Sequence, residues 1–278
     1  MPRATNGAVE IEYESFGDGP ETILLVNGLG SQMTRWPADF CEKLAARGFR
    51  VARYDNRDTG LSTWFKEGAR YILKDMAADG MAVLDALGAA QAHIAGVSMG
   101  GMIVQRMAID YPDRVLSLTS IMSAPSGDVT ATPEAMAVIT TPPPDPAADF
   151  EAYVAHAMKN GRTIGSPAYP WTDEERRERV IGEYRRAFNP AGVIRQRQAI
   201  GADGDRTEEL KRLRVPTVVL HGENDPLVQP VNGRQTAEAI PGAELRIIPG
   251  MGHDLPPGLH DIFIDAITSA VARAKTPA

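Results

Sequence analysis

Residues 92–110, AHIAGVSMGGMIVQRMAID, contain the stretch that decides the fold. The first four residues read as an apolar strand, and a helical pattern runs from Met99 to the end of the stretch. This order predicts that Ser98 lies at the tip of a tight strand-to-helix turn, with its hydroxyl directed away from the sheet and beside helix N-terminal N–H groups. Gly96 and Gly100 leave room for such a strained turn to pack against its neighbours.

Short apolar runs alternate with helical patterns along most of the chain, which is typical of an α/β fold with a mostly parallel central sheet and helices on both faces. At the start, Val9, Ile11 and Tyr13 alternate with glutamates, which predicts a half-solvated antiparallel strand at one edge. The predicted buried strands are 22–26, 49–54, 91–97, 115–122, 216–220 and 244–248, and the predicted flanking helices are 37–47, 72–87, 99–110 and about 258–273.

The strand signal disappears between about residues 124 and 213, where helical signals follow one another. The signals are an N-cap at Thr132, an apolar stripe from Phe150 that ends at Gly161, a capping box formed by Thr172 and Glu175, and a short helix opened by Asn189-Pro190. We therefore expect a helical cap, residues 124–213, inserted into one core domain formed by residues 1–123 and 214–278. Such a cap would lie over the strand ends, where α/β sheets bind ligands.

Composition limits the function classes. A formal charge of −7 argues against a nucleic-acid partner, and no apolar run is long enough to cross a membrane. The N-terminal residues lack a secretory core, and the single cysteine, Cys41, fits a reducing compartment, so we expect a soluble cytoplasmic protein. No His-Glu-x-x-His motif occurs, and we expect neither a metal nor a cofactor.

A serine nucleophile needs a base, and five histidines are available. His253 is the best candidate, because it lies in a glycine-rich loop directly after the last predicted strand, at the same sheet edge as Ser98. His93 and His260 fit structural positions in a strand and a helix. His156 lies on a cap helix, and His221 ends a strand but leads directly into a turn.

Asp225 is the best candidate for the acid that orients the base. It follows the penultimate strand, and the order Ser98, Asp225, His253 is the order expected for this architecture. Glu223 and Asp128 remain competitors. For the oxyanion, one donor is expected to be the N–H of Met99, and a second should come from the loop Asn27-Gly28-Leu29-Gly30-Ser31.

Taken together, these motifs resemble the α/β-hydrolase superfamily over nearly the whole chain, and in particular cofactor-free ester hydrolases of the aclacinomycin methylesterase type. The matching segments are 26–30, 54–62, the Ser98 turn, 222–226 and 248–253. The resemblance implies that Ser98 is the nucleophile, His253 the base and Asp225 the acid, with backbone donors at Leu29 and Met99. Two residues depart from the pattern: Asn27 stands where histidine is frequent, and Asp58 where glycine is frequent.

We therefore predict a serine hydrolase that cleaves carboxylic esters of a small-molecule substrate through an acyl-enzyme, with the cap setting substrate choice. Lactone or carbon–carbon bond hydrolysis on the same triad, or a slow-turnover ligand receptor, remains an alternative, and the oligomeric state stays open. The expected pocket is apolar. Its candidate lining residues, several of which must be plain core, are Met33, Trp36, Met122, Met136, Met158, Trp171 and Leu255.

Overall fold

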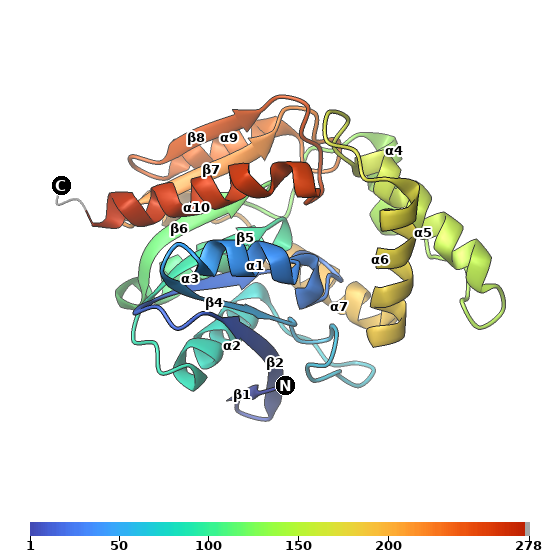
Figure 1. The fold of residues 1–278 in the computed structure, drawn as a ribbon, viewed down its shortest axis with the longest axis horizontal. Helices are drawn as coiled ribbons and strands as arrows, with labels where there is room; N and C mark the ends of the chain where they lie inside the picture. The colour runs from blue at the N-terminus through green and yellow to red at the C-terminus, as the bar shows by residue number, and fades with distance from the viewer. Residues whose placement is uncertain (276–278) are drawn as a thin grey trace.

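An eight-stranded sheet runs through the computed structural model, which describes residues 1–275 (Figure 1). Its strand order is β1-β2-β4-β3-β5-β6-β7-β8. The six strands from β4 to β8 in that order pair in parallel, whereas β1 and β2 pair in antiparallel fashion at one edge. The predicted α/β class and its antiparallel edge are thus confirmed. The strands are β1 Arg3–Asn6, β2 Val9–Phe16, β3 Glu21–Val26, β4 Phe49–Tyr54, β5 Ala92–Val97, β6 Val115–Ile121, β7 Thr217–Gly222 and β8 Glu244–Ile248.

Helices cover both faces of the sheet because each central strand is apolar on both sides. Along β3, Leu24 packs into one core and its neighbour Leu25 into the other, as the two-residue period of a strand requires. The first core also contains residues of α2 (Leu73–Ala86), α3 (Met99–Asp110) and α9 (Pro230–Ala239), and the second contains residues of α1 (Ala38–Ala45) and α10 (His260–Ala274). Helix α9 is an element that the sequence pattern did not predict.

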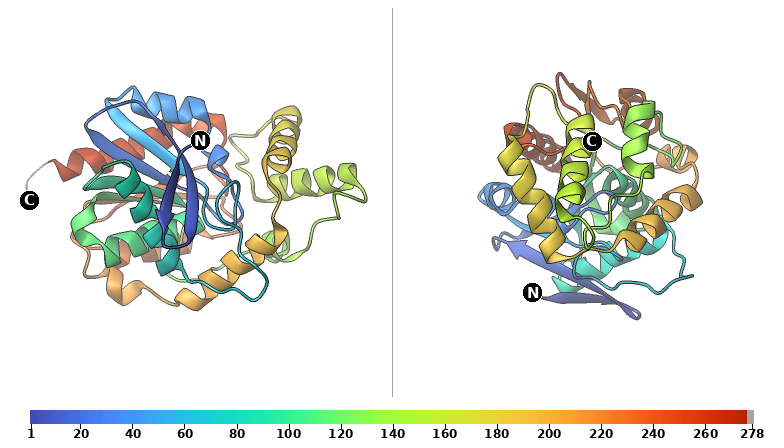
Figure 2. Two further views of the ribbon diagram at one scale, coloured as in Figure 1. Left: turned by 90° about the horizontal axis from the view of Figure 1, so that it is seen from below. Right: turned by 90° about the vertical axis from the view of Figure 1, so that its right-hand side faces the viewer.

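Four longer helices and one short helix connect β6 to β7, and α4, α5 and α6 lie beyond one end of the sheet (Figures 1 and 2). Loops that follow β3 and β8 pack against this helical segment, so it lies at the carboxyl end of the parallel strands. The helices are α4 Pro133–Thr140, α5 Phe150–Ile164, α6 Asp173–Arg186, α7 Pro190–Asp203 and α8 Thr207–Leu210, and the 3₁₀ turns elsewhere are Met33–Arg35, Pro112–Arg114 and Pro257–Leu259.

The predicted starts and ends of helices in this segment were partly correct. The N-cap at Thr132 and the capping box of Thr172 are present. The prediction that Gly161 ends a helix was wrong, since α5 continues to Ile164. A Cβ at Gly161 would lie 2.7 Å from Nη1 of Arg176, so this glycine serves the packing of α5 against α6. The helix opened by Asn189-Pro190 is also longer than predicted, with 14 residues.

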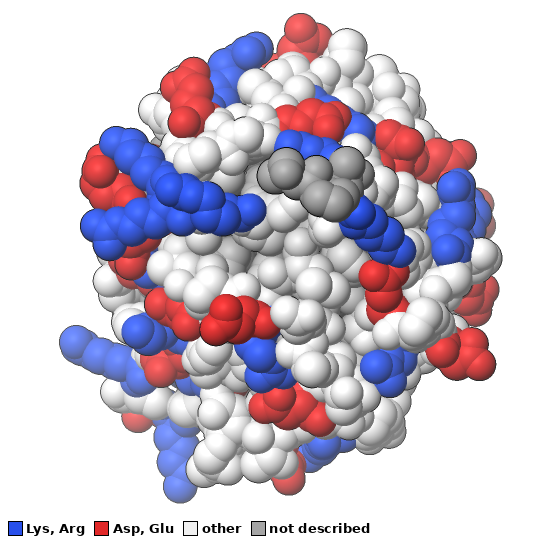
Figure 3. Space-filling view, turned by 90° about the vertical axis from the view of Figure 1, so that its left-hand side faces the viewer, with Lys and Arg blue, Asp and Glu red and all other residues white. Residues whose placement is uncertain are grey.

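Two surface properties complete the fold. Among residues 1–275, no helix combines the length and apolar character that crossing a membrane requires. On the face that lies away from α4, α5 and α6, acidic and basic side chains are interspersed (Figure 3). That face therefore carries side chains of both signs, with one group of basic side chains at the upper left of the view.

Candidate active site

Ser98 occupies a strained turn between β5 and α3. Its φ of 56° and ψ of −123° lie outside the usual regions for a residue with a side chain. A Cβ at Gly96 would lie 2.1 Å from the carbonyl oxygen of Gly100, and a Cβ at Gly100 would lie 2.3 Å from that of Val26. Both positions therefore require glycine, and the predicted strand–turn–helix context of Ser98 is present.

Ser98, His253 and Asp225 form one hydrogen-bonded chain. Nε2 of His253 lies 3.0 Å from Oγ of Ser98, and Nδ1 lies 2.7 Å from Oδ2 of Asp225. Asp225 is only 2% exposed and His253 9%, whereas Ser98 is partly accessible. An ionised carboxylate can only accept, so Nδ1 carries the proton and Nε2 is free to accept the hydroxyl proton of Ser98.

Two backbone groups hold the Asp225 carboxylate in this orientation. Its Oδ1 accepts hydrogen bonds from the N–H groups of Leu227 at 2.9 Å and Val228 at 2.8 Å, which leaves Oδ2 for His253. The competing acids, Glu223 and Asp128, are exposed and make no hydrogen bond to His253. The chain of bonds thus passes through Asp225.

Two of the other four histidines, His221 and His93, are hydrogen-bonded elsewhere. Nε2 of His221 lies 2.6 Å from the carbonyl oxygen of Val228, and burial lowers the pKa of His221. Nδ1 of His93 lies 2.8 Å from Oγ of Ser117 within the sheet, and burial lowers the pKa of His93 as well. Among the histidines of residues 1–275, His253 is the one hydrogen-bonded to the hydroxyl of Ser98, so the geometry supports it as the base candidate.

The loop that carries His253 is fixed by the segment after α5. The N–H of His253 donates to the carbonyl oxygen of Ile164 at 2.6 Å. Ser166 accepts a hydrogen bond from the N–H of Gly252 at 2.9 Å and donates its hydroxyl to Asp254 at 2.5 Å. Burial raises the pKa of Asp254 even though these Ser166 bonds favour its charged form. The sequence did not identify Ser166, whose side-chain bonds reach a remote part of the chain.

Two backbone N–H groups flank Ser98 without a hydrogen-bond partner in the described part of the chain: those of Leu29 and Met99. Met99 begins α3, where N–H groups have no partner within the helix. The loop after β3 lies against the serine, because a Cβ at Gly28 would be 3.2 Å from Cβ of Ser98. Asn27, one of the two departures, is fully buried, and its carbonyl accepts a hydrogen bond from the amide of Asn56 at 3.0 Å.

Comparison with known proteins identifies the family. The family model described as serine aminopeptidase S33 matches residues 19–257. The chain belongs to this α/β-hydrolase family. A rhodomycin D methylesterase from Streptomyces sp. strain C5 is 32% identical over 98% of this chain and 98% of its own length. A putative carbamate hydrolase from Variovorax paradoxus strain S110 is 30% identical, with 96% of this chain and 98% of the relative covered.

A solved structure supports the same fold for this α/β-hydrolase. The meta-cleavage product hydrolase from Pseudomonas fluorescens IP01 superposes with a TM-score of 0.83 at 22% identity, covering 99% of this chain and 98% of that one. The 32%-identical methylesterase relatives confirm the resemblance to methylesterase-type α/β-hydrolases. In residues 1–275 of this α/β-hydrolase, no group of three or more histidine, cysteine, aspartate or glutamate side chains is arranged to hold a metal ion.

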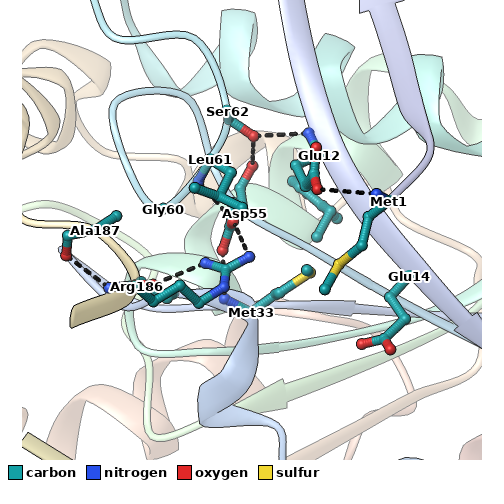
Figure 4. A network of polar contacts seen from close by, with 12 residues as sticks. Met1, Glu12, Glu14, Met33, Asp55, Gly60, Leu61, Ser62, Arg186 and Ala187 are labelled. Carbon is teal, nitrogen blue, oxygen red and sulfur yellow. Dashed lines mark hydrogen bonds and ion pairs between the residues drawn. The ribbon is translucent and has the colours of Figure 1, made fainter. Parts of the chain in front are cut away.

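Buried ion pairs tie α6 and α7 of this α/β-hydrolase to the loop after β4. Asp55 accepts from the N–H groups of Met33 and Leu61, and its Oδ2 lies 2.7 Å from the guanidinium of Arg186 on α6 (Figure 4). Asp58 pairs at 2.7 Å with Arg195 on α7.

Asp58, the second departure, has a φ of 67°, a backbone conformation in which glycine is frequent and aspartate is tolerated. Burial acts to raise the pKa of Asp58, but the bonds from Arg195, from the backbone of Phe65 and from the hydroxyl of Tyr71 hold that pKa below its ordinary value. The residue that replaces glycine in this turn therefore also anchors α7.

A cavity of about 470 Å³ lies between α5, α6, α7 and the loop after β3 of this α/β-hydrolase. Its walls include Leu29 beside the serine and the aromatic rings of Tyr153, Tyr184 and Phe188. The ring centroids of Tyr184 and Phe188 are 5.3 Å apart, and those of Tyr153 and Tyr184 5.5 Å. His156 also lines the cavity.

The seven apolar residues proposed from the sequence are not among the residues that line this cavity. Trp36 stacks on Phe40 in the core, with ring centroids 5.1 Å apart, and Trp171 lies beneath the guanidinium of Arg179 at 4.6 Å. The remaining ones are buried in or near the core (Met33, Met122 and Leu255) or half-buried on α4 and α5 (Met136 and Met158). Whether any of the seven contacts substrate stays a prediction, and the aromatic part of this cavity's wall comes instead from Tyr153, Tyr184 and Phe188.

Proposed function

We propose that this protein hydrolyses carboxylic esters through an acyl-enzyme, with Ser98 as nucleophile, His253 as general base and Asp225 as the orienting acid. The observation that carries the proposal is the unbroken chain from Oγ of Ser98 through His253 to Asp225, at 3.0 and 2.7 Å. Names of the relatives support the reaction class, since methylesterases and carbamate hydrolases both cleave acyl compounds.

The geometry supports a two-step mechanism. Oγ of Ser98 attacks the ester carbonyl while Nε2 of His253 takes its proton, and the resulting oxyanion receives hydrogen bonds from the N–H groups of Leu29 and Met99. Collapse breaks the carbon–oxygen bond, and His253 returns its proton to the departing alcohol. Water, deprotonated by His253, then attacks the acyl-serine, and collapse breaks the bond from the acyl carbon to Oγ of Ser98. His253 returns its proton to Oγ, which releases the acid and restores the serine.

The substrate that this site fits best is an ester of a bulky acid with a small alcohol. The cavity beside Leu29 has the size of a small-molecule site and a mainly apolar, aromatic wall, which suits a large acyl group. The methylesterase names of the 32%-identical relatives agree with a small leaving alcohol. We assign the helical segment of residues 124–213 the role of a cap over this cavity.

Turnover of p-nitrophenyl and methyl esters by the purified protein tests the proposal, with Ser98→Ala as the matched variant. We expect Ser98→Ala to fold normally, to lose labelling by a fluorophosphonate and to lose about 10⁴–10⁶-fold in kcat. A variant that keeps more than a few per cent of the activity would show that another group is the nucleophile. Lactones and vinylogous diketones serve as competing substrates, and ligand binding without turnover of any substrate would identify a receptor.

A further inference from the structure

Gln196 of α7 reaches across to the loop that carries Leu29. Its Oε1 accepts a hydrogen bond from the N–H of Gly30 at 2.8 Å. Its Nε2 donates to the carbonyl oxygen of Arg57 at 2.8 Å and to the hydroxyl of Thr59 at 2.7 Å. The side chain is fully buried, so both ends of the amide are committed to these loops.

The position of this contact matters because Gly30 directly follows the expected oxyanion donor. The peptide groups on either side of Leu29 share its Cα, so fixing the N–H of Gly30 limits how the N–H of Leu29 can rotate. Gly30 has a φ of 63°, and a Cβ there would lie 2.9 Å from Val193 of α7. The other end of the turn is closed by the N–H of Ser31, which donates to the carbonyl oxygen of Gly28.

Other bonds also hold helix α7 in place. Removing one of them while Gln196 stays intact separates an effect of helix docking from an effect of Gln196 itself. Arg195, its neighbour in sequence, pairs with Asp58, and Asn189 donates to the carbonyl oxygen of Asp58 at 3.0 Å. Neither residue bonds to the loop of Leu29. Removing the Arg195 pair therefore loosens the helix without removing the bond to Gly30.

We propose that Gln196 is a positioning residue of the oxyanion site: it holds the Leu29 N–H in the orientation that a developing oxyanion needs. The inference rests on the proposed ester hydrolysis at Ser98. It gives the segment between β6 and β7 a part in the chemical step, in addition to the substrate choice expected from the sequence.

The test compares Gln196→Met with two matched variants. Gln198→Met makes the same replacement at an exposed position of the same helix. Arg195→Met removes the ion pair between the neighbouring Arg195 and Asp58. Three quantities are measured for each: kcat and KM with p-nitrophenyl butyrate, the Ki of an alkyl boronic acid that forms a tetrahedral anion on the serine, and Tm.

We expect Gln196→Met to lower kcat by about 10- to 100-fold, to raise the boronate Ki by a similar factor and to change KM little, because only the transition state needs the aligned N–H. Gln198→Met should match the wild type. Arg195→Met should lower Tm and leave the boronate Ki within about twofold of the wild type.

Two results would overturn the proposal. One is a Gln196→Met protein whose kcat and boronate Ki stay within twofold of Gln198→Met. The other is an equal rise in Ki for Gln196→Met and Arg195→Met, which would assign the effect to docking of the helix. If Gln196→Met does not fold, Thr59→Val removes one of the two anchors of the amide and must give a smaller change in the same direction. Absent turnover and absent fluorophosphonate labelling in the wild type would instead refute the proposed function.

Discussion

Replacing Asp225 by asparagine is expected to disable the enzyme by reversing the proton arrangement of His253. Oδ1 of Asp225 accepts from two buried backbone N–H groups, those of Leu227 and Val228. The asparagine oxygen must occupy that place, so its NH₂ group faces Nδ1 of His253. Nδ1 then accepts, the ring proton moves to Nε2, and Nε2 cannot take the proton of Ser98.

The structure also sets the size of the effect. Turning the asparagine to restore the productive tautomer leaves two buried N–H groups unpaired, at about 1–3 kcal/mol each. The total of about 2–6 kcal/mol corresponds to about a 30- to 26,000-fold reduction of the productive form. Loss of the carboxylate charge beside the imidazolium adds to this, so we expect kcat to fall by about 10³–10⁴-fold.

The assay is kcat with p-nitrophenyl butyrate at neutral pH, with Tm measured on the same samples. Glu223→Gln and Asp128→Asn are the controls, because both carboxylates are exposed and unbonded to His253. Both controls should keep activity within about twofold, since surface substitutions away from a site have small effects. An Asp225→Asn variant with more than a tenth of the wild-type kcat, or a crippled Glu223→Gln variant, would refute the reasoning.

Two further predictions concern the helical segment. The lowered pKa of Asp58 means that its ion pair with Arg195 contributes stability above the ordinary pKa of 3.8, and that this contribution is lost as the pH falls through the lowered folded value. The Tm difference between wild type and Asp58→Asn should therefore be largest near about pH 7 and shrink below about pH 4; a difference that stays constant would contradict the ion-pair account. Tyr184→Ala should shift the kcat/KM ratio between octanoate and acetate esters by about tenfold or more, because its ring lines the cavity, whereas Met158→Ala should not. Equal shifts from both variants would place Met158 in the pocket after all.

The sequence predicted the site where local constraints and chain order were sufficient. Ser98 was predictable because its turn has room for glycine alone two residues before and two residues after the serine, which itself has a positive φ. These requirements give a five-residue sequence pattern at the boundary between a strand and a helix. His253 and Asp225 were predictable because parallel strands end at one edge, so residues that follow two such strands must approach the serine. The prediction of their roles still awaits the experiments above.

The pocket was not predictable in the same way, because side-chain type does not reveal which face of a helix covers the site. Methionine and tryptophan fit a core as well as a cavity, and Trp36 is fully buried against Phe40. Tyr184 of α6 and Phe188 after it are four residues apart, a helical spacing, but spacing alone does not say whether such rings contact the core or a substrate. That choice depends on how α5, α6 and α7 pack over the strand ends, which is a tertiary property.

Gln196 shows why positioning residues escape sequence reasoning altogether. A glutamine in a helical stretch reads as a solvated surface residue, and nothing in its neighbours indicates burial. Its burial is favourable only because three remote groups, at Gly30, Arg57 and Thr59, satisfy its amide. Those groups belong to loops at the ends of β3 and β4, more than 130 residues away along the chain. The same contacts couple α7 to the loop of Leu29. If Gln196 orients the Leu29 N–H as we propose, a displacement of α7 that breaks the bond to Gly30 disturbs the chemistry at Ser98, whereas one that keeps this bond does not.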